Sequence, residues 1–291
     1  MNEMQVLANG FSAGAIYSLV ALGFAIKFIP SRFFDFSYAA TLLLAAVMTY
    51  WSYEYMHFPI VASVSIGGIT GMAFSLGAEL LVFTPLRKRH STDLVLIIAS
   101  LGVLIVMTNS IALALGDSHR TISGCFGTIS LGTVNLGLVQ VSTIFIALGT
   151  CACCWISLVK SAWGIRTRAV ANNPDLASSV GIRVGRIIYE ASAIGGAVGG
   201  LGAALFTLDM GLSPSLGFQL LLPGIVAAVI GGSGTIVGAI VGGFLVGIVQ
   251  HLSGWVISSG WQDGMFFVIL IFFLMFRPSG LFGKPASAAR I

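Results

Sequence analysis

The stretch LVLIIASLGVLIVMTNSIALAL, from Leu94 to Leu115, contains no charged residue and is long enough to cross a lipid bilayer. A helix needs about 20 mostly apolar residues to span roughly 30 Å of hydrocarbon. Backbone polar groups cannot remain unpaired in lipid, so a continuous apolar run of this kind is expected to form a helix. The stretch from Leu138 to Val159 repeats the pattern. These two runs predict a helical protein embedded in a membrane.

The composition of the whole chain favours the same fold class. Of its 291 residues, 57% are hydrophobic and 8% are charged, and the mean hydropathy is +1.00. A soluble domain carries about 25% charged residues, and a membrane β-barrel would show short alternating segments. We therefore predict an all-α, polytopic transmembrane bundle that forms a single domain over residues 1–291. Because no basic segment precedes the first apolar run, we expect that run to be retained as a helix.

The apolar runs predict the positions of the membrane-embedded segments. They lie at about 5–26, 34–52, 59–83, 94–115, 137–159, 187–208, 219–250 and 264–276. The segment at 219–250 contains Pro223 and the run GGSGT, from Gly231 to Thr235. Glycine and serine inside a hydrophobic segment are typical of a break or a re-entrant turn. We therefore expect this segment to divide into two pieces, at about 219–231 and 236–250.

The charged residues sort by side when the broken segment crosses twice and the N-terminus lies outside. The inner side then holds Lys27, Arg32, Arg87, Lys88, Arg89, Lys160, Arg166, Arg168, Arg183, Arg186, Arg277, Lys284 and Arg290. The outer side holds Arg120 and the acidic residues Glu3, Glu54, Asp117, Asp209 and Asp263. Lys and Arg gather at the cytoplasmic ends of spans, so this sorting predicts a cytoplasmic C-terminus. The net charge of +4 follows from topology, and we expect no nucleic-acid partner.

Few ionisable residues fall inside the apolar runs. Glu79 lies in the third run, and we expect it either to pair with a basic residue such as Arg87 or to belong to a gate. Lys27, Asp35 and Glu190 lie near span ends, where Lys27 is expected to snorkel to the interface. The sequence has no ATP-binding P-loop, no zinc motif and no converging catalytic groups. We therefore expect a chain that is not an enzyme and has no metal or cofactor.

Glycines cluster in two of the apolar runs, largely at one-turn spacing. The clusters are Gly195, Gly196, Gly199, Gly200 and Gly202, and Gly234, Gly238, Gly242, Gly243 and Gly247. Small residues at this spacing let helix backbones approach closely in lipid. The clusters predict tight helix packing, and they are also compatible with helices that line a path and slide.

The stretch SAWGIRTRAVANNPDLASSVGIRVGRI, from Ser161 to Ile187, is a polar and basic island. Within it, Asn173 is expected to cap a short helix that has Pro174 at its first position and Asp175 in its first turn. Gly181 suits a left-handed helix end. The pattern predicts a helix from Pro174 to Val180, preceded by a turn from Ile165 to Ala171. An ordinary positive-inside loop is the alternative, although the length and the capping favour a docking element.

The run GIRTRAVANNPDLASSVGI, from Gly164 to Ile182, resembles the coupling loop of bacterial ABC importer permeases, above all those of the paired-permease branched-chain amino acid family. That loop reads roughly G-R-x-x-R-A-x-A-x-[DN]-x-x-x-A-x-x-x-G-I. The matching residues are Gly164, Arg168, Ala169, Ala171, Asn173, Ala177, Gly181 and Ile182, whereas Ile165 departs and the arginine is displaced to Arg166.

Three other stretches are similar to the same family, and one departs from it. ANGFSAGAIYSLVALGF, from Ala8 to Phe24, resembles the first helix of the family. GGSGTIVGAIVGG from Gly231 and RPSGLFGK from Arg277 also match. Family members often read N-F-A-H-G-E after the first helix, where this chain has DFSYAA from Asp35 to Ala40. Because that region borders the central path in the family, the departure leaves the solute open.

The resemblance implies partners and site residues. Two ATP-binding subunits would grip the cytoplasmic coupling loop, at about 161–186. The residues implied for coupling are Gly164, Arg166, Arg168, Ala171, Asn173, Asp175 and Gly181. The other implied partners are a second homologous permease, which would form a heterodimer, and a periplasmic or extracellular substrate-binding protein. The implied location is the bacterial cytoplasmic (inner) membrane.

The implied solute is a branched-chain or other neutral amino acid, with urea or a short amide as the alternative within the family. Candidate residues for the translocation path are Asn9, Tyr17, Ser18, Asp35, Tyr38 and Thr41. Two functions from other classes stay open. An ion-coupled secondary transporter would take up solute without ATPases, and a channel would show flux that nucleotide does not affect.

Overall fold

The computed structural model describes residues 3–116, 118–122, 128–131, 134–232, 234–256, 262–277 and 280–283. Asp117, Ser233, Lys284 and Arg290 lie outside these ranges, as does the side chain of Asp263. The elements are α1 (Glu3–Ser31), α2 (Ser37–Glu54), α3 (Ile60–Ala78), the π-helix η1 (Glu79–Phe83), α4 (Thr84–Lys88), α5 (Asp93–Leu115), β1 (Thr128–Leu131), β2 (Val134–Gly137), α6 (Leu138–Lys160), α7 (Ala162–Asn172), α8 (Pro174–Ser179), α9 (Val184–Met210), α10 (Leu216–Gly231), α11 (Ile236–Val256) and α12 (Gln262–Phe276).

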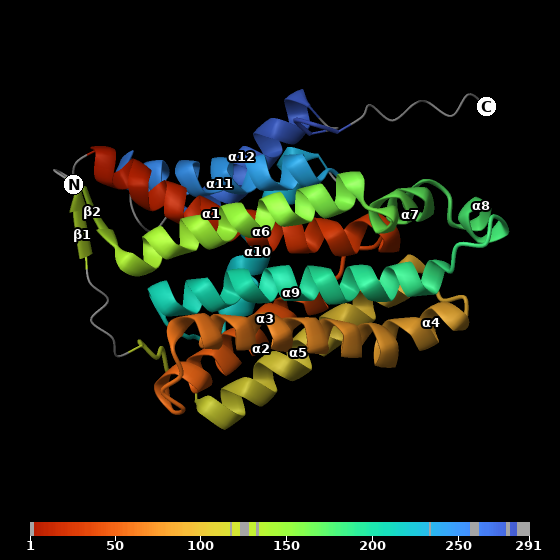
Figure 1. Cartoon of the computed structure of the whole chain (residues 1–291), viewed down its shortest axis with the longest axis horizontal. Helices are drawn as coiled ribbons and strands as arrows, with labels where there is room; N and C mark the ends of the chain where they lie inside the picture. Colours follow the sequence, from red (N-terminus) through yellow and green to blue (C-terminus); the bar gives the residue numbers. More distant parts are fainter. Residues whose placement is uncertain are drawn as a thin grey trace.

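The predicted all-α, polytopic bundle is confirmed. The apolar runs of the sequence are helical, with the run at 219–250 divided between α10 and α11, and the helices lie mostly along the long axis of the molecule (Figure 1). Six helical segments of the described chain are long and apolar enough to cross a membrane, and α10 and α12 are shorter apolar helices. The segment from Ile60 to Lys88 is one of the six, and it contains the π-helix η1.

One element was not predicted. Strands β1 and β2 form an antiparallel hairpin in which Thr128 pairs with Gly137 and Leu131 with Val134. The hairpin lies at the end of the bundle where the N-terminus lies (Figure 1). Each strand has only four residues, which is too short a run for alternation of side chains to stand out in the sequence.

Helix α9 packs against α1 and α3 through its glycines, as the clusters predicted. A Cβ atom on Gly195 would lie 2.6 Å from the Gly23 carbonyl oxygen of α1, and one on Gly200 would lie 2.7 Å from the Gly67 carbonyl oxygen of α3. Contacts this close leave no room for a side chain, so backbone meets backbone on both sides of α9. Helices α1 and α9 are accordingly the most buried of the membrane-spanning helices.

The predicted break in the 219–250 segment is confirmed. Helix α10 ends at Gly231, and Gly232 and Gly234 have φ angles of 110° and 92°, which favour glycine because it has no Cβ. Helix α11 then turns back along α10, since Gly231 contacts Gly238 and Gly242 contacts Ala227. The turn reverses the chain, so α10 and α11 form an antiparallel pair.

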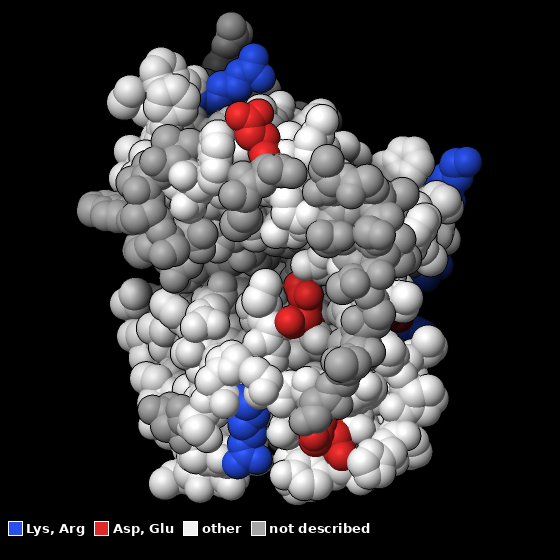
Figure 2. Space-filling view, turned by 90° about the vertical axis from the view of Figure 1, so that its left-hand side faces the viewer, with Lys and Arg blue, Asp and Glu red and all other residues white. Residues whose placement is uncertain are grey.

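Positive charge collects at one end of the bundle. Helices α4, α7 and α8 lie together at the end opposite the N-terminus (Figure 1), and Arg87 and Lys88 occupy the last turn of α4. Arg120 belongs to the other end, where its backbone pairs with Leu212. The view onto that other end shows acidic side chains beside a few basic ones (Figure 2). Arg87 and Lys88 thus lie at the end opposite Arg120, as the sequence predicted.

Substituting Gly195→Ala tests the glycine packing. The new methyl group would collide with the Gly23 carbonyl and with Lys27 Cγ, each 2.6 Å away, so we expect α1 and α9 to be forced apart at a cost of about 1–3 kcal/mol. The thermal midpoint of the purified protein in detergent should fall. In the control Gly102→Ala, nothing lies within 4 Å of the new methyl group, and alanine favours a helix over glycine. An unchanged midpoint for Gly195→Ala would contradict the packing described.

Candidate functional site

Helix α7 is fixed against the end of α6. The Ser161 side chain caps α7 by accepting a hydrogen bond from Gly164 N at 3.2 Å. A Cβ atom on Gly164 would collide with the Leu158 carbonyl of α6, so glycine is required for this close approach. The Arg168 guanidinium donates to the same Leu158 carbonyl oxygen, which lies in the last turn of α6 and lacks a helical partner. Gly164 and Arg168 therefore hold α7 on α6.

Helix α8 forms as the sequence predicted, within one residue. Asn173 Oδ1 accepts hydrogen bonds from the backbone amides of Asp175 and Leu176, both at 3.0 Å. The helix runs from Pro174 to Ser179 and not to Val180, which is its C-cap. Gly181 has a φ of 87°, in the left-handed region that glycine adopts without strain.

The turn expected before α8 is a longer helix than predicted. The expectation covered Ile165 to Ala171, whereas α7 runs from Ala162 to Asn172. The Ser161 cap accounts for the earlier start, because a side-chain acceptor there satisfies an amide at the helix N-terminus. Helices α7 and α8 thus meet with only Asn173 between them.

Two further contacts attach the α7–α8 segment to the bundle. The Arg32 guanidinium, just after α1, donates to the Ala171 carbonyl oxygen at the end of α7. A small apolar cluster joins α7 and α8 to the start of α9, through the buried side chains of Val170, Ala177 and Ile187. The segment is therefore tied to α1, α6 and α9.

The outer face of α8 carries exposed apolar side chains. Leu176 is 66% exposed and Val180 is 75% exposed, although they lie on a polar segment outside the spans. Asp175 is also exposed, in the first turn. Apolar groups displayed in this way, with polar residues around them, are typical of a protein–protein contact.

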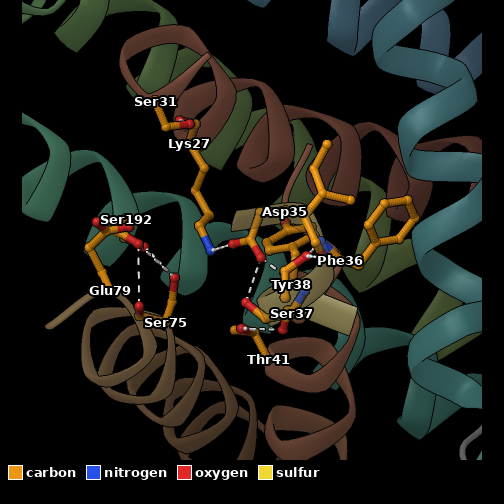
Figure 3. A network of polar contacts seen from close by, with 12 residues as sticks. Lys27, Ser31, Asp35, Phe36, Ser37, Tyr38, Thr41, Ser75, Glu79 and Ser192 are labelled. Carbon is orange, nitrogen blue, oxygen red and sulfur yellow. Dashed lines mark hydrogen bonds and ion pairs between the residues drawn. The ribbon is translucent and has the colours of Figure 1, made fainter. Parts of the chain in front are cut away.

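A buried ion pair lies at the same end of the bundle, where α1 turns into α2. Lys27 Nζ lies 2.5 Å from Asp35 Oδ2, and the two residues are 6% and 4% exposed. Asp35 Oδ1 also accepts from Ser37 N at 2.9 Å and from Ser37 Oγ, and Lys27 Nζ lies 5.5 Å from the centre of the Tyr38 ring. Figure 3 shows these groups converging from α1, the turn and α2.

The expectation that Lys27 snorkels to the interface is wrong. Helix α1 ends at Ser31 and the chain doubles back, so Asp35 meets Lys27 inside the bundle. A carboxylate at hydrogen-bonding distance satisfies the ammonium where it is, and the side chain does not need to reach water. Sequence reasoning missed this pair, because nothing local to Lys27 reveals where the turn returns.

Glu79 pairs with Arg87, which was one of the two alternatives predicted for this residue. Arg87 Nη1 lies 2.5 Å from Glu79 Oε1, and the Glu79 side chain is 3% exposed. The π-helix η1 begins at Glu79, and such segments often occur at functional sites. Close by, Ser75 Oγ donates to the Ser192 carbonyl oxygen at 2.8 Å and joins α3 to α9 (Figure 3). The ion pair does not test the other alternative, so a role of Glu79 in a gate stays a prediction.

The candidate path residues fall into separate groups. Asp35, Tyr38 and Thr41 lie together at the start of α2 (Figure 3), where Tyr38 donates to the Val20 carbonyl and Thr41 to the Ser37 carbonyl. The other three, Asn9, Tyr17 and Ser18, follow one another along α1. Their hydrogen bonds include those of Asn9 with Gln5, Tyr17 with Gln250, and Ser18 with the Ala15 carbonyl and Cys151. None of the six lines the cavity of about 620 Å³ between α2, α3 and α5. Their place on a path stays a prediction.

Replacing Asn173 by alanine tests the capping of α8. The amides of Asp175 and Leu176 would lose their acceptor, at a cost of about 0.5–2 kcal/mol for the helix. Hydrogen exchange at these two amides should accelerate by about 2-fold to 30-fold. The neighbouring Asn172→Ala, at the exposed end of α7, is the matched control and should leave both amides as slow as before. Equal acceleration in the two variants would show that Asn173 is not the cap.

The Lys27–Asp35 pair predicts rescue by a second substitution. Lys27→Met leaves the Asp35 carboxylate buried without its cation, which costs about 3–5 kcal/mol. Lys27→Met/Asp35→Asn removes both charges, so its thermal midpoint should lie above that of Lys27→Met, despite the extra change. A double variant that is less stable than Lys27→Met would show that the two residues do not act as a pair.

Comparison with known proteins identifies the family. A family model described as the branched-chain amino acid transport system permease component matches residues 6–275. The high-affinity branched-chain amino acid transport system permease protein BraD of Pseudomonas aeruginosa is 25% identical, over 97% of this chain and 96% of its own length. LivH of Escherichia coli K12 is 27% identical over 97% and 96%, and probable LivH of Methanocaldococcus jannaschii is 25% identical over 97% and 93%. No solved structure matches the chain.

These relatives are transport permease subunits and not enzymes. The family match extends from the first turns of α1 to the last turn of α12, so it includes the described membrane-spanning helices and the α7–α8 segment. This multi-pass membrane protein therefore belongs to the family of branched-chain amino acid transport system permease components.

Proposed function

We propose that this chain is the membrane-spanning permease subunit of an ATP-driven importer for branched-chain or other neutral amino acids, and that its full length acts as one domain. The observation that carries the proposal is the capped α7–α8 segment, which is tied to α1, α6 and α9 and displays Leu176 and Val180 outward. Family membership supports the same function.

The partners follow from that function. Two ATP-binding subunits would lie on the cytoplasmic side, one of them against the outer face of α8. A second permease would complete the membrane part, and a binding protein would deliver solute on the other side. Exposed apolar groups on a rigid segment offer such a subunit a contact that needs little ordering. We place α8 and the C-terminus on the cytoplasmic side and the N-terminus outside, in the inner membrane. The basic end around α4 and α7 supports this orientation.

The proposed coupling residues have distinct physical parts in the segment. Gly164 and Arg168 hold α7 against α6, and the Ala171 carbonyl oxygen accepts a hydrogen bond from Arg32. Asn173 caps α8 and Gly181 ends it. Asp175 in the first turn of α8 and Arg166 on α7 have exposed side chains. Five of these seven residues therefore shape the segment, and two face outward.

The neutral solute is supported by the charge inside the bundle. Lys27 is paired with Asp35, and Glu79 with Arg87, so these buried charges cancel. A path that passes such neutralised pairs would favour a solute without net charge, such as a zwitterionic amino acid, over a cation or an anion.

Purification of the complex and reconstitution test the function. The tagged chain, purified in mild detergent from its own cells, should bring down two ATPase subunits and a second permease. In proteoliposomes with its binding protein, the complex should take up labelled leucine only when ATP is supplied. Uptake by the chain alone, driven by an ion gradient, would instead show a secondary transporter, and flux unaffected by nucleotide would show a channel.

Gly181→Val should uncouple ATP hydrolysis from uptake. Valine cannot adopt the φ of 87° at this position without strain, so α8 would be displaced from its place on α9. We expect the complex to hydrolyse ATP while leucine uptake falls at least about tenfold, the loss equivalent to about 1.4 kcal/mol of strain. Gly185→Val, four residues along, is the control: it has an ordinary φ and open space around it. Normal ATP-coupled uptake by Gly181→Val would contradict the role of the segment.

A further inference from the structure

A polar pocket of about 360 Å³ opens beside the start of α9, at the base of the α7–α8 segment. Three arginines line it: Arg166 from α7, Arg183 as the N-cap of α9, and Arg186 from the first turn of α9. The side chains of Ile182 and Ile187 complete an apolar floor. Small-ligand sites have volumes of about 300–1,000 Å³, so this pocket is large enough for a small polar group.

The pocket carries uncompensated positive charge. Glu190 also lines the pocket, and its Oε1 lies 2.9 Å from Arg186 Nε, so this carboxylate balances one guanidinium. Across the residues described, no carboxylate lies within ion-pair distance of Arg166 or Arg183. The N-terminus of α9, a helix of 27 residues, adds the positive end of its dipole. The pocket therefore favours an anion with several oxygens, which two guanidiniums can share through paired hydrogen bonds.

The pocket lies beside the points where the chain leaves one apolar helix and enters another, a level at which lipid headgroups are expected. The membrane-spanning helix α9 begins at Val184, directly after Arg183, and the spanning helix α6 ends at Lys160, shortly before Arg166. Basic pockets at this level between transmembrane helices recognise anionic headgroups. A phosphodiester has two charged oxygens that can each meet a guanidinium, and the remaining volume of the pocket suits the polar group attached to it.

We infer that this pocket binds the phosphate of an anionic phospholipid, held between Arg166 and Arg183. The lipid would then secure the base of the α7–α8 segment to the membrane surface. The pocket shares Arg166 with the proposed coupling residues. Lipid binding can be measured on the purified chain without ATPase subunits or solute, so the inference can fail while the proposed function stands, and the reverse also holds.

Native mass spectrometry of the full chain in detergent tests the inference. The protein is titrated with phosphatidylglycerol, with phosphatidylcholine, and with inorganic phosphate. The wild-type chain should bind phosphatidylglycerol in preference to phosphatidylcholine, and Arg166→Gln/Arg183→Gln should weaken that binding about 30-fold, or about fivefold for each arginine. The control Lys88→Gln/Arg89→Gln removes two exposed basic side chains from the same end of the bundle and should bind as the wild type does.

Three results would overturn the inference. Equal weakening in the two double variants would show general charge attraction, and displacement of the lipid by inorganic phosphate at a similar concentration would make free phosphate the ligand. If Arg166→Gln/Arg183→Gln keeps its lipid but no longer binds the ATPase subunits, the two arginines bind a carboxylate of a partner protein and not a lipid. Should the double variant fail to fold, Arg166→Gln alone decides the question, with an expected loss of about fivefold.

Discussion

The fold depends on backbone contact between helices in a solvent that gives apolar side chains no reason to associate. Lipid tails are as apolar as leucine, so helices in a membrane gain little from burying side chains and depend on close packing. Helix α9 meets this constraint with glycine on the faces toward α1 and α3. The ring of Tyr38 enters the notch that Gly199 leaves, and its hydroxyl donates to the Val20 carbonyl at 3.0 Å. The absence of side chains at the glycines of α9 thus determines how closely the central helices pack.

The same packing makes room for charge inside the bundle. The stem of Lys27 lies against Gly195, where a Cβ would come within 2.6 Å of it, and its ammonium reaches Asp35. Arg32, which follows α1, donates to the end of α7. Arg32 and Asp35 both lie in the turn between α1 and α2. A change in that turn would therefore alter both the buried ion pair and the attachment of the α7–α8 segment to the bundle.

Local signals in the sequence predicted the local structure. The apolar runs predicted the helices, and the run from Gly231 to Thr235 predicted the break. Asn173 and Gly181 predicted the ends of α8 to within one residue. The contacts that unite these parts were not predictable. The Lys27–Asp35 pair and the bond from Arg168 to Leu158 depend on how the chain returns on itself, which no spacing in the sequence encodes. The family resemblance pointed to Gly164, Arg168 and Asn173, but only their contacts in the structure show what each residue does.

The attachments of α8 determine what a force on it would do. Helices α7 and α8 share Asn173 and the buried cluster of Val170 and Ala177, so the segment cannot absorb a displacement by bending between them. The displacement would pass to α6 through Arg168, to α1 through Arg32 and to α9 through Ile187. Where α1 and α9 meet, Gly195 lies directly against the Gly23 carbonyl, so a displacement of either helix would be felt by the other through backbone contact. A pull on α8 would therefore reach the centre of the bundle through α1 and α9.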